Sequence, residues 1–175
     1  VLLVIGGSQG ARALNGWLDR DRLRVCRSWY VVHQTGPSHP ESERLPGYFR
    51  IPYLREEYCD VLAAADCIVC RAGATTLWEA ANLGKCMVLV PLGLDASRGD
   101  QIRNARYFGE AGAAVVADSA PIDESRLLTI LEKLAAAGDV REGYGRVARN
   151  LVTSDASVKI AQALLGVMIE EEARA

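Results

Sequence analysis

Residues 67–79 read CIVCRAGATTLWE, an apolar run that ends in a turn of small residues and continues with helical spacing. Residues 67–70 predict a buried strand, and the apolar positions that follow predict a helix: Leu77, Ala80, Ala81 and Leu83. A strand that passes through a small-residue turn into a helix directs unpaired backbone N–H groups toward one point. Because the positive end of the helix dipole faces the same point, the stretch predicts an anion-binding βα turn.

Glu79 adds a second chemical group to this turn. It lies about one and a half turns into the predicted helix, too far along to be a phosphate ligand. A carboxylate at that place can accept two hydroxyl hydrogen bonds from a ribose just beyond the phosphates. Phosphate donors followed by a diol acceptor indicate a nucleotide site.

A second glycine-rich turn opens the chain. The apolar run Val1–Ile5 predicts a buried strand, and Gly6-Gly7-Ser8-Gln9-Gly10 follows it. Glycines allow positive φ and let a ligand approach the backbone. Their spacing is neither that of the dinucleotide-binding GxGxxG nor that of a Walker loop. A tight turn without a ligand explains this segment equally well.

Apolar runs alternate with helix-period segments along the chain. The strands lack polar alternation, which is typical of a parallel sheet covered on both sides by helices. We therefore predict one α/β domain over residues 1–175, a doubly wound, mostly parallel six-stranded sheet with helices on both faces. Predicted strands are Leu2–Ile5, Trp29–His33, Phe49–Pro52, Cys67–Cys70, Met87–Val90 and Ala114–Val116. Predicted helices are Ala11–Asp19, Glu56–Ala65, Thr75–Leu83, Gln101–Ala111, Asp123–Ala136, Arg141–Asn150 and Asp155–Ile169.

Composition excludes several classes of protein. Half of the 175 residues are apolar and the formal net charge is −2, which does not indicate a surface for nucleic acid. The sequence contains neither a signal peptide nor an apolar stretch of the ~20 residues that span a bilayer. The chain begins with Val1 directly in a predicted strand, so we expect it to be part of a longer protein.

The five cysteines predict neither a disulfide framework nor a metal centre. Cys67 and Cys70 are three apart on a predicted strand, so their side chains point to opposite faces. No second Cys/His pair completes a zinc site. Apolar surroundings indicate small buried hydrophobes, and unpaired thiols fit a reducing cytoplasm.

Polar and glycine-rich residues gather where the predicted strands end, and ligands of doubly wound sheets bind at that edge. Among them, Gln101 and Asn104 lie one helical turn apart on one face. Two carboxamides suit sugar hydroxyls, although a solvated first turn fits equally. His33 is more typical of a structural imidazole bonded to backbone, and His39 of a solvated one. No catalytic triad, carboxylate pair or metal cluster is evident, which favours a binder of an activated donor.

Four motifs together resemble the MurG family, the bacterial N-acetylglucosaminyltransferases that convert lipid I to lipid II in peptidoglycan synthesis. They are GGSQGARALN at 6–15, HQTG at 33–36, CRAGATTLWE at 70–79 and SRGDQIRNA at 97–105. They occur in the family's order and cover nearly the whole chain. The resemblance implies the C-terminal, UDP-GlcNAc-binding half of a GT-B enzyme, with no cofactor and no metal.

The resemblance also implies roles for individual residues. Ser8 would contact the donor, and Leu54 would hold the uracil through its backbone. The diphosphate would face Ala74, Thr75 and Thr76, and the ribose hydroxyls would bind Glu79. The GlcNAc hydroxyls would contact Gln101 and Asn104.

The family's N-terminal half would supply the lipid I site, the membrane-facing patch and the general base. The full protein would then act at the cytoplasmic face of the bacterial inner membrane, and this half alone would bind donor with little turnover. Two alternatives stay open from the sequence. One is a free-standing UDP-GlcNAc-binding subunit of a split transferase, and the other is a UDP-sugar epimerase or a non-catalytic nucleotide-sugar sensor.

Overall fold

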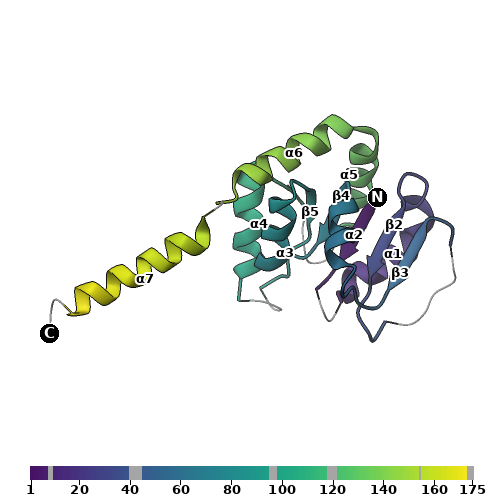
Figure 1. Ribbon diagram of the computed structural model, residues 1–175. Coiled ribbons are helices and arrows are strands. Elements are labelled where there is room, and N and C mark those ends of the chain that lie inside the picture. Colours follow the sequence, from purple (N-terminus) through teal and green to yellow (C-terminus); the bar gives the residue numbers. More distant parts are fainter. Residues whose placement is uncertain (8–9, 40–44, 95–97, 118–121, 154, 173–175) are drawn as a thin grey trace.

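The computed structural model describes residues 1–7, 10–39, 45–94, 98–117, 122–153 and 155–172 (Figure 1). Within them, six strands form one sheet in the order β3-β2-β1-β4-β5-β6, and every neighbouring pair is parallel. The doubly wound parallel sheet that the sequence predicts is confirmed. The strands are β1 (Leu2–Ile5), β2 (Val31–Gln34), β3 (Tyr48–Ile51), β4 (Cys67–Cys70), β5 (Cys86–Leu89) and β6 (Val115–Val116).

The helices follow the predicted pattern, with one clear difference in length. α1 continues to Val25, whereas the sequence predicted an end at Asp19. In its second half Arg20 and Arg24 are exposed while Val25 packs in the core, so the helix keeps a buried side through a stretch that looks polar. The helices are α1 (Arg12–Val25), α2 (Tyr58–Ala64), α3 (Ala74–Asn82), α4 (Asp100–Glu110), α5 (Glu124–Ala136), α6 (Gly138–Asn150) and α7 (Ala156–Glu172).

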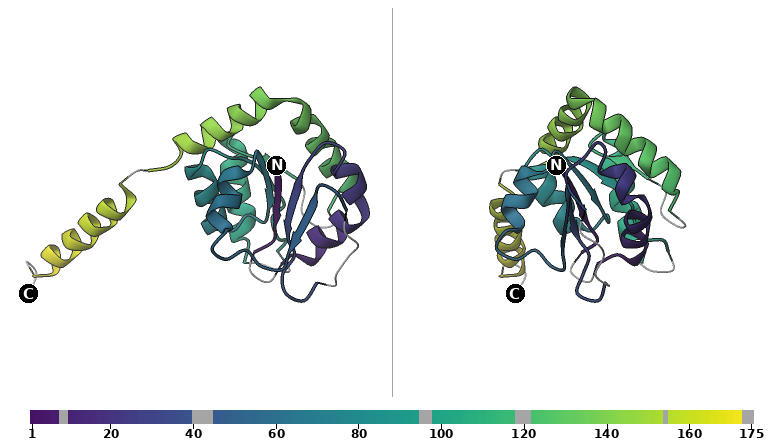
Figure 2. Two further views of the ribbon diagram at one scale, coloured as in Figure 1. Left: turned by 45° about the vertical axis from the view of Figure 1, so that its right-hand side comes forward. Right: turned by 90° about the vertical axis from the view of Figure 1, so that its right-hand side faces the viewer.

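Helices cover both faces of the sheet (Figure 2). Leu2 and Val4 point into a core shared with α1 and α5. Leu3 and Ile5 point into a second core shared with α2, α3, α4 and α6. Cys67 and Cys70 divide between the same two cores, as the strand geometry predicts. The sheet is therefore buried on both faces, which leaves the ends of its strands as the place for a site.

α7 extends away from the α/β body (Figure 1). Four of its apolar side chains are more than half exposed: Val158, Ile160, Leu164 and Leu165. Among the described residues, no helix combines the length and the apolar character that crossing a membrane requires. None of residues 156–166, the part of α7 whose side chains are described, belongs to either core.

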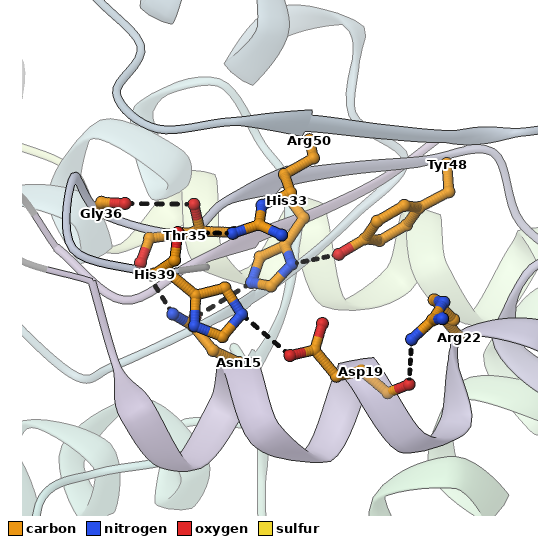
Figure 3. A network of polar contacts seen from close by, with 9 residues as sticks. All are labelled: Asn15, Asp19, Arg22, His33, Thr35, Gly36, His39, Tyr48 and Arg50. Atoms are coloured by element: carbon orange, nitrogen blue, oxygen red, sulfur yellow. Dashed lines mark hydrogen bonds and ion pairs between the residues drawn. The ribbon is translucent and has the colours of Figure 1, made fainter. Parts of the chain in front are cut away.

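A buried polar chain links α1 to β2 and β3 (Figure 3). Asn15 Nδ2 donates to the Thr35 carbonyl at 2.7 Å, which turns Asn15 Oδ1 toward His33 Nε2 at 3.1 Å. Nε2 must therefore carry the imidazole proton. Nδ1 is then the acceptor, and the Tyr48 hydroxyl donates to it at 2.7 Å. Asn15, His33 and Tyr48 each have a hydrogen-bond partner in this chain, which holds α1 to the two strands.

Both histidines differ from their predicted surroundings. His33 is structural, as predicted, but its partners are the side chains of Asn15 and Tyr48 rather than backbone groups. His39 is not solvated: its Nε2 lies 2.9 Å from Asp19 Oδ2, and its carbonyl accepts a hydrogen bond from Arg50. Local sequence shows neither pairing, because each joins segments that only the sheet brings together.

His33 makes the stability of the fold depend on pH. Burial lowers the pKa of His33 from 6.5 to about 4. Between these pH values His33 is protonated in the unfolded chain but stays neutral in the native chain. The free energy of unfolding therefore falls as the pH falls from 6.5 toward 4. The full contribution is about 3 kcal/mol. Urea unfolding from pH 7 to pH 4.5 should show this loss, and His33→Gln should flatten it. If the free energy of unfolding changes equally with pH in wild type and in His33→Gln, the prediction is contradicted. His39→Gln, which replaces the other histidine, is the control.

Candidate functional site

A cavity of about 570 Å³ lies at the carboxyl ends of the strands, beside the point where the strand order reverses between β1 and β4. Ligands of open α/β sheets bind at such a switch point. The cavity joins the exits of β1, β2 and β3 to the beginnings of α2 and α3. It is lined by Ile5, Gly7, Gln34, Tyr53, Leu54, Arg55, Tyr58, Thr75, Thr76 and Glu79.

The glycine-rich turn after β1 has a packing reason for two of its glycines. A Cβ on Gly10 would lie 2.0 Å from the Thr35 carbonyl oxygen, and one on Gly6 would lie 2.3 Å from the Ala11 Cβ. The turn backbone therefore packs directly against the exit of β2 and the start of α1. Gly7, by contrast, lines the cavity. The predicted donor contact Ser8 lies outside the described residues.

The beginning of α3 offers free backbone donors. Its first helical bond runs from the Leu77 N–H to the Gly73 carbonyl at 3.1 Å. Among the described hydrogen bonds, the N–H groups of Ala74, Thr75 and Thr76 have no acceptor, and Gly73 provides no capping side chain. A Cβ on Gly73 would meet no heavy atom within 4 Å, so the approach to these donors is open. This is the geometry of an anion site.

Glu79 lies in the same cavity, one turn further along α3. Its Oε2 accepts a hydrogen bond of 2.6 Å from the Tyr58 hydroxyl. Tyr58, the first residue of α2, was not among the predicted site residues. The available signal was weak: a helix that begins just after the third strand delivers its first side chain to the same edge of the sheet.

Gln34 connects two walls of the cavity. Its Oε1 accepts the Leu54 N–H at 2.9 Å, and its Nε2 donates to the Gly7 carbonyl at 3.1 Å. The glycine-rich turn and the segment after β3 are thus tied through one carboxamide. Because the Leu54 N–H already donates to Gln34, a base held by the Leu54 backbone would donate a hydrogen bond to the Leu54 carbonyl.

Gln101 and Asn104 lie at the same edge of the sheet but hold loops. Gln101 Oε1 accepts the Leu92 N–H at 3.1 Å, and Asn104 Nδ2 donates to the Ala72 carbonyl at 3.0 Å. Neither lines the cavity. Among the described residues, Gln101 Nε2 and Asn104 Oδ1 have no hydrogen-bond partner. Each carboxamide can therefore hold a loop with one atom and a ligand with the other.

Arg71 joins the turn before α3 to the loop that follows β5. Its Nη1 donates to the carbonyls of Val90 and Pro91 at 2.9 and 3.2 Å. Burial lowers its pKa. Arg71 thus links the turn before α3 to the loop after β5, while on α4 Asn104 bonds to that turn and Gln101 to that loop.

Known proteins resemble this chain in sequence and in fold. The model of the glycosyltransferase family 28 C-terminal domain matches residues 1–152. A protein of Staphylococcus aureus (strain MRSA252) is 37% identical over 135 residues, which are 77% of this chain and 38% of that protein. Its name is UDP-N-acetylglucosamine--N-acetylmuramyl-(pentapeptide) pyrophosphoryl-undecaprenol N-acetylglucosamine transferase. This chain thus spans about two fifths of the length of such relatives.

Solved structures of glycosyltransferases are also similar to this chain. The crystal structure of Acinetobacter baumannii MurG matches with a TM-score of 0.76 and 25% identity, covering 94% of this chain and 49% of that one. The kitacinnamycin glycosyltransferase matches with a TM-score of 0.67 and 23% identity, over 93% of this chain and 42% of that one. The second likeness shows the fold alone.

Gly7 and Gly10 form a matched pair for testing the glycine-rich turn. Both have positive φ, 90° and 77°, but only at Gly10 would a Cβ meet a backbone atom. Gly7→Ala should cost about 1–2 kcal/mol for the left-handed conformation. Gly10→Ala should cost about 1–3 kcal/mol more, because the turn must also move away from Thr35. Urea unfolding measures both, and equal losses would show that the contact with Thr35 is easily relieved.

Proposed function

The chain belongs to the glycosyltransferase family 28 C-terminal domain family, and on that premise we propose that it is the donor-binding half of an inverting transferase. The donor is UDP-GlcNAc, the acceptor is lipid I and the product is lipid II of peptidoglycan synthesis. One observation carries the proposal: α3 presents unpaired backbone N–H groups and the Glu79 carboxylate to the same cavity.

The cavity can accommodate the parts of UDP in order. Thr75 and Glu79 both line it and are separated by about 6 Å along α3, so one ligand can contact both residues. The diphosphate would accept hydrogen bonds from the N–H groups of Ala74, Thr75 and Thr76. The ribose hydroxyls would donate to Glu79, and the uracil would lie against Leu54 at the far wall. Each part of a nucleoside diphosphate would thus contact a different group of the cavity.

The hexose would extend from the diphosphate toward the loop before α4. There, Gln101 Nε2 and Asn104 Oδ1 would contact its hydroxyls. Ser8 would contact the donor from the glycine-rich turn. Gln101 and Asn104 would position the sugar, because each is a residue of α4 whose carboxamide is already fixed by a hydrogen bond to a neighbouring loop.

The reaction is a displacement at the anomeric carbon. The acceptor hydroxyl attacks from the face opposite UDP, the bond from the anomeric carbon to the phosphate oxygen breaks, and its electron pair leaves with UDP. Backbone N–H groups at the start of α3 stabilise the charge that develops on the diphosphate. The proton of the acceptor goes to a general base in the N-terminal half, which also provides the lipid I site and the contact with the cytoplasmic face of the membrane.

The alternative functions have less support. An epimerase needs acid and base groups beside the sugar. Glu79 is the only carboxylate among the described lining residues, and it is already bonded to Tyr58. The relatives named above are transferases rather than epimerases or sensors. A free-standing subunit would use the same donor pocket and would differ only in where its acceptor half is encoded.

Glu79→Gln tests the nucleotide site. Losing a charged acceptor for the ribose hydroxyls should weaken UDP binding by about 1.5–3 kcal/mol. Isothermal titration of UDP measures the change, and thermal unfolding checks that the fold persists. Glu56→Gln removes a nearby exposed carboxylate that does not line the cavity, and it should leave UDP binding intact. Unchanged affinity in Glu79→Gln would remove Glu79 from the site.

Gln101→Ala and Asn104→Ala test the hexose contacts. If each carboxamide touches only the sugar, its loss should weaken UDP-GlcNAc about tenfold, as expected for a neutral hydrogen bond, and UDP hardly at all. Titrating both ligands against each variant separates the two effects. Equal weakening of UDP and UDP-GlcNAc would mean that these side chains act only by holding the loops at Leu92 and Ala72.

A further inference from the structure

The contact between Tyr58 and Glu79 joins two elements that are far apart in sequence. Tyr58 begins α2, Glu79 lies on α3, and the hydroxyl donates to Oε2 at 2.6 Å. Such a short distance is typical of a charge-assisted hydrogen bond. Both side chains line the cavity, so the bond lies inside the proposed ribose subsite.

Without this bond the Glu79 carboxylate would have little to hold it. Glu79 is exposed on α3, and Tyr58 is its one hydrogen-bond partner among the described residues. A glutamate has three side-chain torsions, and fixing them on ligand binding costs free energy. The Tyr58 bond restricts them beforehand, and Oε1 has no hydrogen-bond partner among the described residues.

The environment of Tyr58 keeps it a donor. Partial burial raises its pKa, and the hydrogen bond to Glu79 raises it further, so the phenol stays protonated throughout the neutral range. The side chain of Thr76, which also lines the cavity, acts to lower the pKa of Tyr58. Tyr58, Thr76 and Glu79 all line the same cavity.

We propose that Tyr58 is the positioning residue of the ribose subsite and makes the pocket selective for ribonucleoside over 2′-deoxyribonucleoside diphosphates. The inference rests on the proposed function. A vicinal diol donates two hydrogen bonds, and a carboxylate receives both only when its two oxygens face the diol together. Tyr58 holds Glu79 in that orientation, with Oε1 open to one hydroxyl and the remaining lone pair of Oε2 open to the other.

The experiment titrates UDP and 2′-deoxyuridine diphosphate against wild type, Tyr58→Phe and Tyr53→Phe. Tyr53 lines the same cavity and, among the described residues, forms no hydrogen bond with Glu79, so its variant controls for loss of a phenol hydroxyl as such. Wild type should prefer UDP by about tenfold or more. Tyr58→Phe should weaken UDP about tenfold and the deoxynucleotide less than about threefold, whereas Tyr53→Phe should keep the full preference.

A double variant separates positioning from direct contact. In the Glu79→Gln background, Tyr58→Phe should change UDP affinity by less than about twofold, because it acts through Glu79. A full effect in that background would overturn the positioning role. The inference would also be overturned if Tyr58→Phe weakened the binding of both nucleotides equally. The same holds if the wild type bound UDP and 2′-deoxyuridine diphosphate with equal affinity. A wild type that binds neither nucleotide would overturn the proposed function together with this inference.

Discussion

The parallel pairing of β1 with β4 is the constraint on which the site depends. In this register Ile5 lies opposite Cys70, so the two strands end at the same level. The glycine-rich turn and the turn before α3 then leave the sheet side by side, while their helices pass to opposite faces. A space opens between two diverging chains, and no side chain is needed to create it. The cavity at this point follows from strand order before any ligand is considered.

Much of the polar chemistry near this edge serves to hold the loops in place. Gln34 ties the glycine-rich turn to Leu54, and the chain through Asn15 and His33 ties α1 to the exit of β2. On the other side Arg71 links the loops around α3 and α4. These bonds are made without a ligand. Loops fixed in this way lose little conformational entropy when a nucleotide binds.

The groups proposed to contact the nucleotide are distributed differently. The donors at the start of α3 are backbone groups that the helix itself leaves unpaired, so they need no support beyond the strand that precedes them. Glu79 is a flexible side chain and depends on Tyr58 for its orientation. Backbone recognition of phosphate is thus rigid by construction, whereas recognition of the sugar hydroxyls depends on a second residue.

The sequence by itself determined the parallel sheet, the covering of both faces and the edge that carries the site. These follow from apolar runs and helical periods, which are local patterns and are visible within a few residues. Glu79 and the turn at Gly73 were proposed for the site in the same way, because their positions within a βα unit depend only on spacing along one helix. Helix ends were less certain, since the charged second half of α1 shows its buried side only through Val25.

Only the tertiary structure decided which side chains meet. Tyr58 with Glu79, Gln34 with Leu54, and His33 with Tyr48 join residues that lie on different elements. Their distances depend on how the strands are ordered in the sheet and where each helix packs, and no local pattern encodes that. For the same reason the loop contacts of Gln101 and Asn104 could not be distinguished from ligand contacts, because a carboxamide offers the same donors and acceptors to a loop as to a sugar.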